Sequence, residues 1–137
     1  MEQHDILSLI PHRPPFVMID KLLMINEKGA AGTFKISEKN LFLDDGFLAE
    51  AALIENIAQT AAARIGYMSL KEDKPAPVGY LGAVQNFEVI SLPKLNDEIT
   101  TEIFIENVIF NVLIISGKIM CNKKNIASCN MKIFTSN

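Results

Sequence analysis

The chain has 137 residues, 49% of them hydrophobic and 21% charged, a composition typical of one globular domain rather than a disordered segment. The formal net charge of −3 argues against a nucleic-acid-binding surface. No apolar run approaches the roughly 18 residues of a membrane-spanning helix, and the N-terminal residues lack the basic and apolar regions of a signal peptide. We therefore expect a single cytoplasmic domain over residues 1–137, with no nucleic-acid partner and no membrane span.

The N-terminal third is expected to contain a short helix followed by a strand hairpin. Pro11 should end the helix, because proline cannot continue one, and the prolines that follow keep the chain extended. The expected ranges are 5–10 for the helix, 11–15 for the extended segment, 16–27 and 33–37 for the strands and 28–32 for the break between them.

A long helix is expected next, within residues 41–66. Asp44, Asp45 and Gly46 are a plausible start, since aspartate caps helices well, and Gly66 is a plausible end. The segment is apolar around most of its circumference, which indicates that other elements wrap it. Its polar side is expected to hold Glu50, Asn56, Thr60 and Arg64.

Four strands are expected in the C-terminal half, at 78–90, 97–107, 112–121 and 126–134, with a hairpin turn at 122–125. We interpret them as a meander. The whole pattern predicts an α+β fold in which an antiparallel sheet of five to six strands covers one long helix. Cys121 and Cys129 fall in the last strands and are expected to be reduced core residues.

Glu55 is the unusual residue of the expected helix, because it lies outside the polar side. Its neighbours three and four positions away are Ala51, Ala52, Ala58 and Gln59. Small residues let a ligand or another backbone approach closely, and desolvation favours the protonated form of a carboxyl group. Glu55 is therefore a candidate proton donor. The alternative interpretation is structural, with Glu55 paired to Arg64 or Lys21 or placed at a subunit contact.

Three stretches carry a resemblance to a known family. Residues 6–25, "ILSLIPHRPPFVMIDKLLMI", resemble the N-terminal Pro-His-Arg-x-Pro-Phe signature of bacterial 3-hydroxyacyl-acyl-carrier-protein dehydratases. "LIENIAQTAAA" resembles the helix motif of the same family, here carried by Glu55, Ala58 and Gln59. Residues 80–99 are similar to a later segment of that family. The resemblance thus covers nearly the whole chain.

This resemblance implies a hotdog fold and a dimer whose sheets join edge to edge, with active sites at the interface. In the family, a histidine from one protomer removes the α-proton of the thioester and a glutamate from the other protonates the departing hydroxyl. The glutamate corresponds to Glu55. The substrate-binding positions that the resemblance implies are Gln59, Gly46 and Phe47 near the helix start, and Tyr80, Leu81 and Gly82 in the later segment. No cofactor and no metal site are expected.

One departure from the family pattern affects the chemistry directly. Leu41 stands where the family has the histidine of Gly-His-Phe-Pro-Gly, and leucine cannot accept a proton. His12, in the extended segment, and Asp44 are the candidate substitutes, with Asp45 as an equivalent of Asp44. His12 is usually structural in the family, and helix capping is the simpler role for either aspartate.

Three functions remain open at this stage. The first is a 3-hydroxyacyl-acyl-carrier-protein dehydratase-like protein of fatty-acid or polyene biosynthesis, similar to those of aryl-polyene and flexirubin-type pathways. Such a chain would be a homodimer or would form a heterodimer with a related hotdog subunit, giving Glu55 to a shared site. The second is an acyl thioesterase using Glu55 and Gln59, and the third is a non-catalytic acyl-binding or scaffolding subunit. Acyl carrier protein or acyl-CoA is the expected partner, with Arg64, Lys71, Lys74 and Lys94 as a candidate basic rim.

Overall fold

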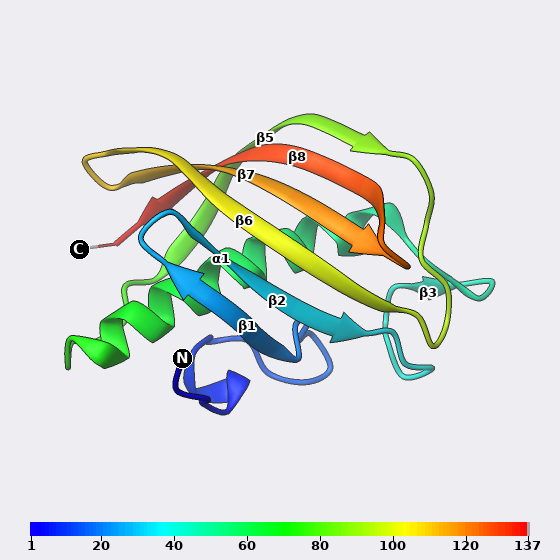
Figure 1. The fold of residues 1–137 in the computed structure, drawn as a ribbon, viewed down its shortest axis with the longest axis horizontal. Helices are drawn as coiled ribbons and strands as arrows, with labels where there is room; N and C mark the ends of the chain where they lie inside the picture. The colour runs from blue at the N-terminus through cyan, green and yellow to red at the C-terminus, as the bar shows by residue number, and fades with distance from the viewer. Residues whose placement is uncertain (137) are drawn as a thin grey trace.

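The computed structural model describes residues 1–136, and its centre is the helix α1 (Glu50–Lys71), wrapped by a six-stranded antiparallel sheet (Figure 1). The strands are β1 (Lys21–Asn26), β2 (Gly29–Lys35), β5 (Gly79–Val89), β6 (Glu98–Ile109), β7 (Val112–Cys121) and β8 (Lys124–Thr135). The smaller elements are the 3-10 turn η1 (Ile6–Ser8) and the paired short strands β3 (Leu43–Asp44) and β4 (Phe47–Leu48). The expected architecture, one long helix covered by an antiparallel sheet, is confirmed.

The order of strands in the sheet differs from the expected meander. It is β1-β2-β6-β7-β8-β5, so β5 lies at an edge and pairs with β8, while β6 pairs with β2 and β7. Residues 90–97 carry the chain from the β5 edge to the middle of the sheet. Sequence alternation indicates which side of a strand is buried but not which strand lies beside it. The prediction of a four-strand meander was therefore wrong, although the last three strands do form one.

The first hairpin is tighter than predicted. β1 and β2 pair from Asn26 opposite Gly29, leaving two residues in the turn, so most of the expected break at 28–32 lies inside β2. Gly29–Gly32 are buried small residues that let the helix and neighbouring strands approach closely. Residues 16–20 precede β1; helix side chains bond to Phe16 and Met18, and the Asp20 N–H donates to the Thr33 carbonyl of β2.

Both predicted ends of the long helix need correction. Asp45 and Gly46 have φ of 51° and 84° and form the turn between β3 and β4, as Asp-Gly pairs do in tight hairpins. The helix begins at Glu50, after Ala49, which makes no side-chain cap. It continues past Gly66 to Lys71. Gly66 is needed for packing, because a Cβ there would collide with the carbonyl oxygen of Leu9.

The polar side of α1 is largely buried. Asn56 and Thr60 are 1% and 0% exposed. The Asn56 amide donates to the Met18 carbonyl at 2.7 Å and accepts from the Thr101 hydroxyl on β6. Arg64 donates to the carbonyl oxygens of the β1–β2 turn region, and burial lowers its pKa. The polar groups of this side thus attach the helix to the sheet.

The two cysteines and the last hairpin agree with the sequence interpretation. Cys121 and Cys129 are buried and form no disulfide. Burial raises the pKa of the Cys129 thiol to about 11 and also raises that of Cys121. Asn122 and Lys123 have positive φ and form the turn between β7 and β8, within the predicted range.

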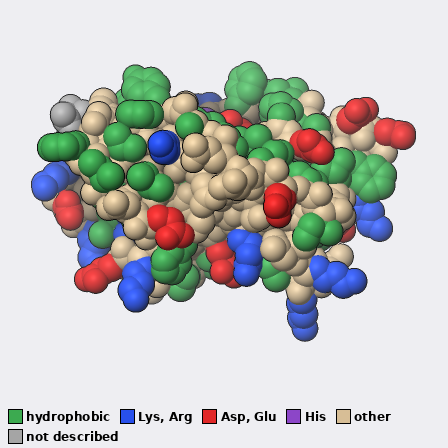
Figure 2. All heavy atoms as spheres, turned by 90° about the horizontal axis from the view of Figure 1, so that it is seen from above, with side chains coloured by type: hydrophobic (Ala, Val, Ile, Leu, Met, Phe, Trp, Pro, Cys, Tyr) green, Lys and Arg blue, Asp and Glu red, His purple; other side chains and the backbone are tan. Residues whose placement is uncertain are grey.

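The outer face of the sheet carries exposed apolar side chains. Figure 2, which views the molecule from above relative to Figure 1, shows hydrophobic side chains gathered in groups among polar ones. Phe104, Phe134 and Tyr80, on β6, β8 and β5, are 52%, 40% and 61% exposed. Grouped apolar side chains of this kind are common where a protein contacts another chain.

Candidate active site

A cavity of about 330 Å³ lies along the open side of α1. It has three walls: the N-terminal segment around Leu9–His12, one side of the helix, and residues 76–81 with Ile133 of β8. The complete lining is Leu9, Pro11, His12, Glu55, Ala58, Ala62, Ile65, Gly66, Ala76, Pro77, Gly79, Tyr80, Leu81 and Ile133. Glu55 and His12 are thus the ionisable acid–base pair in an otherwise mainly apolar space.

Glu55 and His12 face each other at this cavity. The His12 Nε2 atom lies 3.7 Å from Glu55 Oε1, and their side chains are 30% and 39% exposed. The other ring nitrogen, Nδ1, is buried and has no hydrogen-bond partner among the described residues. The structural alternative, a pair with Arg64 or Lys21, is not what the structure shows, because the carboxylate meets His12 instead.

Gln59 fixes the positions of both the carboxylate and the N-terminal segment. Its amide nitrogen donates to Glu55 Oε1 and to the Phe16 carbonyl, both at 2.9 Å. Its oxygen accepts from the Met18 backbone N–H at 2.6 Å. The side chain is 0% exposed. The Gln59 amide therefore makes its hydrogen bonds within the protein. One of them orients the Glu55 oxygen that faces His12.

The segment bearing His12 is held in several places. Its prolines restrict the backbone, and the Arg13 guanidinium donates to the carbonyl oxygens of Ile10 and His12 at 2.9 and 2.7 Å. Leu9 packs directly on Gly66, and Met18 is fixed by two helix amides. A side chain on a segment so restrained has a defined position relative to the helix.

The other candidate site residues predicted from the sequence fall into two groups. Tyr80 and Leu81 line the cavity, while Gly82, the next residue of β5, does not. Asp44, Gly46 and Phe47 lie in the β3–β4 hairpin ahead of the helix and are not among the lining residues. Leu41, at the position of the family histidine, is 56% exposed.

Several cavity residues were missed by sequence reasoning. Ala58 and Ala62 belong to the patch of small residues around Glu55 that the helical spacing indicates, and Ile65 continues the same side of the helix three residues further on, a signal that was not used. Pro77 lies in a polar loop and reaches the cavity only through the fold. No pattern in the sequence connects that loop to the helix.

The candidate basic rim does not line the cavity. The Arg64 guanidinium is bonded to turn carbonyls, and the Lys74 ammonium lies 3.6 Å from Glu72. Lys71 is the last residue of the helix, and Lys94 forms an isolated backbone bridge with Phe47, ahead of the helix start. These lysines are surface residues outside the site.

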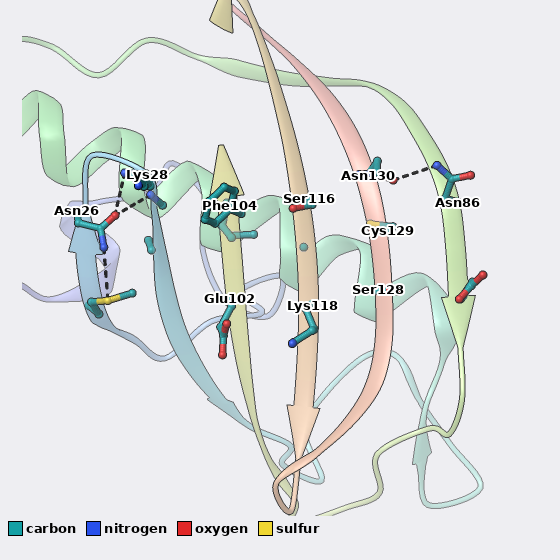
Figure 3. A pocket seen from close by; sticks show the side chains of 16 residues that line it. Asn26, Lys28, Asn86, Glu102, Phe104, Ser116, Lys118, Ser128, Cys129 and Asn130 are labelled. Carbon is teal, nitrogen blue, oxygen red and sulfur yellow. Dashed lines mark hydrogen bonds between the residues drawn. The ribbon is translucent and has the colours of Figure 1, made fainter. Parts of the chain in front are cut away.

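A larger depression of about 700 Å³ lies on the outer face of the sheet (Figure 3). Its lining combines polar and apolar side chains and comes from the strands β5 to β8 and the first hairpin. Glu102 and Lys118 are cross-strand partners there, and the Asn86 amide donates to Asn130 at 3.0 Å. No histidine lines this depression, so it lacks the pairing of a carboxylate with an imidazole that Glu55 and His12 provide in the smaller cavity.

The structure offers no sign of a metal centre in residues 1–136, where no three His, Cys, Asp or Glu side chains gather closely enough to hold an ion. None of the helices within that range has the length and apolarity needed to cross a membrane.

A single long helix wrapped by an antiparallel sheet, with an acidic residue on the helix facing an apolar cavity, defines a hotdog-fold protein. The profile of the ApeP-like family, described as ApeP dehydratase, matches residues 4–137. The chain belongs to this family of dehydratases. The resemblance to acyl-carrier-protein dehydratases seen in the sequence is thereby confirmed.

Individual relatives agree with this placement. The 3-hydroxyacyl-[acyl-carrier-protein] dehydratase FabZ of Thermoanaerobacter pseudethanolicus is 25% identical over 114 residues, covering 79% of this chain and 78% of that protein. The same enzyme of Rhizobium etli is 33% identical over 88 residues, covering 60% and 55%.

Solved structures show the same fold. The dehydratase heterocomplex ApeI:P from Xenorhabdus doucetiae superposes with a TM-score of 0.92 at 15% identity, over 99% of this chain and 93% of the other. A hypothetical thioesterase from Streptococcus pneumoniae with coenzyme A gives a TM-score of 0.68 at 13% identity, covering 96% and 91%.

Proposed function

We propose that this chain supplies Glu55 and His12 to the active site of a 3-hydroxyacyl thioester dehydratase. The observation that carries the proposal is the approach of His12 Nε2 to Glu55 Oε1, 3.7 Å, at the edge of an apolar cavity. Leu41 removes the family histidine, and His12 is the imidazole that the fold brings to the glutamate in its place. The substrate would be a 3-hydroxyacyl chain on an acyl carrier protein or coenzyme A.

The two side chains divide the proton transfers of an elimination. Neutral His12 accepts the α-proton, the electron pair left behind forms the carbon–carbon double bond, and the C–O bond of the hydroxyl breaks. Protonated Glu55 donates to that hydroxyl, which leaves as water. The imidazolium and carboxylate are then within range of each other, so proton return restores the starting states. The distance exceeds a hydrogen bond, as catalytic contacts often do without substrate.

We further propose that a related hotdog chain completes the site. The cavity is bordered by β5, an edge strand whose outer backbone groups have no partner in the sheet, and Tyr80 and Leu81 on it are exposed. Unpaired edges of this kind invite another strand. The structurally similar Xenorhabdus protein is a dehydratase heterocomplex, which supports a hetero-oligomer here as well.

Turnover of a 3-hydroxyacyl-carrier-protein by the chain, alone and mixed with a related hotdog chain that retains the family histidine, tests the proposal. Mass spectrometry of the carrier protein detects loss of one water. Glu55→Gln and His12→Gln should each lower the rate on the order of 10²-fold or more, the usual contribution of a general acid or base.

Glu50→Gln is the matched control, since Glu50 is exposed, lies on the same helix and does not line the cavity. It should leave the rate unchanged. Undiminished turnover in Glu55→Gln would refute the proposed chemistry. Unchanged formation of the biosynthetic end product in cells that carry this variant would favour the non-catalytic acyl-binding interpretation.

The thioesterase alternative gains less from the structure. In that alternative either Gln59 or the helix N-terminus holds the thioester carbonyl, and the Gln59 amide is fully buried and bonded to Phe16, Met18 and Glu55. Incubation with an acyl-CoA series, followed by measurement of free thiol, distinguishes the two reactions. Release of thiol at rates above the elimination would favour the thioesterase.

A further inference from the structure

The turn between β6 and β7 presents apolar side chains at the end of the sheet where the chain also ends (Figure 1). Phe110, in the turn itself, is 98% exposed, and Val108 and Ile109 before it are 60% and 47% exposed. We call these three residues the apolar tip. Residues 107–117 contain no charged residue, although 21% of the whole chain is charged. Apolar side chains this exposed are typical of a contact with another apolar surface.

The tip is apolar on both faces of the sheet. Successive residues of a strand point to opposite faces, so Val108 and Ile109 lie on opposite faces. Val108 pairs with Leu113, which packs against the core, whereas Ile109 pairs with Val112, one residue out of phase with Leu113. A flat protein surface would cover only one of these faces, whereas a surrounding medium contacts both.

The polar groups next to the tip have partners within the chain. Val108 lies on the stretch of β6 beyond its pairing with β2, and its N–H donates to the Asn107 side-chain oxygen at 2.8 Å. The Asn111 carbonyl accepts from the Thr135 N–H at 2.9 Å, and the Asn111 amide donates to the Thr135 carbonyl at 3.1 Å. Unpaired backbone groups are costly where water is absent, and an added strand would need free groups at this edge. This internal pairing therefore favours an apolar medium over the addition of a strand.

The backbone conformation of Phe110 gives a further indication. Its φ is 54°, in a region that glycine and asparagine adopt readily and that is unfavourable for a bulky side chain. The turn thus gives up local stability and places an aromatic ring at its most exposed point. Because the ring is 98% exposed, no contact within residues 1–136 offsets this cost.

We infer that the apolar tip inserts into the interfacial region of a lipid bilayer and holds the protein at a membrane surface. Three residues from Asn107 to Phe110 span about 10 Å along a strand. This length matches the depth of about 5–10 Å to which interfacial segments are buried. The tip has no positive charge and the chain has a net charge of −3, so zwitterionic lipids are favoured over anionic ones. The inference does not depend on the proposed dehydratase chemistry.

Co-sedimentation of the full chain with vesicles of pure phosphatidylcholine measures the partitioning. Phe110→Asn is the test variant, because asparagine tolerates the positive φ and removes the ring. The partition coefficient should fall roughly 10- to 100-fold, the factor that corresponds to burying one phenylalanine side chain. Ile90→Asn is the matched control, since Ile90 is also exposed but lies in the segment after β5, outside the tip. It should leave the partitioning unchanged.

A fluorescent reporter locates the inserted residue directly. The chain contains no tryptophan, so Phe110→Trp introduces a single indole at the tip. Tryptophan is favoured at the membrane–water interface. Its emission should therefore shift to shorter wavelength when phosphatidylcholine vesicles are added, and lipids with brominated acyl chains should quench it. Phe104→Trp is the control, because Phe104 is exposed on the same strand but outside the tip. It should show neither effect.

The outcomes separate membrane insertion from a protein interface and from the catalytic proposal. Absence of partitioning in the folded chain, or equal partitioning in Phe110→Asn, would overturn the inference. Loss of association with a second protein chain in Phe110→Asn, without any partitioning to vesicles, would also overturn it and assign the tip to a protein interface. Turnover without vesicles should be unchanged in Phe110→Asn, because Phe110 does not line the cavity. Circular dichroism of each variant establishes that it is folded.

Discussion

The two sides of α1 have opposite chemistry. On the side toward the sheet, Asn56, Gln59 and Thr60 are at most 1% exposed, and their polar atoms bond to the backbone, to Thr101 or to Glu55. On the side toward the cavity, Ala58 and Ala62 remain partly open. A helix at a protein surface usually shows the reverse pattern, with polar residues outward. The polar residues thus attach the helix to the sheet and to the N-terminal segment, and Ala58 and Ala62 line the cavity on the other side.

The buried side also explains how two distant segments form one site. Met18 is bonded through its carbonyl to Asn56 and through its N–H to Gln59. Gln59 then bonds to Glu55. One pair of amides therefore holds the N-terminal segment to the helix and orients the carboxylate, so stability and the geometry of the site depend on the same contacts.

The largest effect on stability is expected from Asn56→Leu, which removes the hydrogen bonds of Asn56 on the buried side of α1. This change leaves the Met18 carbonyl and the Thr101 hydroxyl buried without partners, and each such group costs about 1–3 kcal/mol. We expect the free energy of unfolding in urea to fall by about 2–4 kcal/mol. Adding Thr101→Val should restore part of the loss, since both members of that pair are then apolar. A fully stable Asn56→Leu variant would contradict the role assigned to the buried amide.

The sequence predicted the elements with a strong local signal. The range 112–121 coincides with β7, an apolar segment that is ended at once by the Asn122–Lys123 turn. The Asp45–Gly46 pair was misread as a helix start although Asp-Gly is also a strong hairpin signal. The hairpin forms because Leu48 and Gly46 bond to residues 93–95, a segment remote in the sequence.

The site was predictable only in part. Glu55 was recognisable because an acid among alanines breaks the helix pattern, and His12 was recognisable from its motif. Their contact was not predictable from spacing, because 43 residues separate them and the packing of Leu9 on Gly66 determines the path of the segment between. The burial of Asn56 could not be foreseen either, since its partner Thr101 lies on a strand whose place in the sheet the pattern did not give.

An intermediate effect on stability is expected from the buried thiol of Cys129, on strand β8 of the sheet that covers α1. The Cys129 pKa is about 11 in the folded protein because of burial, against an ordinary value of 9.0. Between these values the unfolded chain loses the proton first, so the unfolded state binds fewer protons and stability falls as pH rises. We expect a loss of up to about 1.4 kcal/mol per pH unit in this window. Urea unfolding at several pH values, with Cys129→Ala as control, measures it; an equal slope in the control would assign the effect to other groups.

The smallest effect on stability is expected from Glu55→Gln, on the open side. The replacement keeps an oxygen that can accept from Gln59, and it removes only a half-exposed pair with His12, which is worth about 0–1 kcal/mol. We expect the free energy of unfolding to change by less than about 0.5 kcal/mol. Gln59→Leu, one helical turn away, would leave the Met18 N–H and Phe16 carbonyl without partners and should cost several times more. Equal losses in the two variants would mean that Glu55 is a structural residue like Gln59. A large difference, with turnover lost in Glu55→Gln, would show that the carboxylate is retained for chemistry and not for folding.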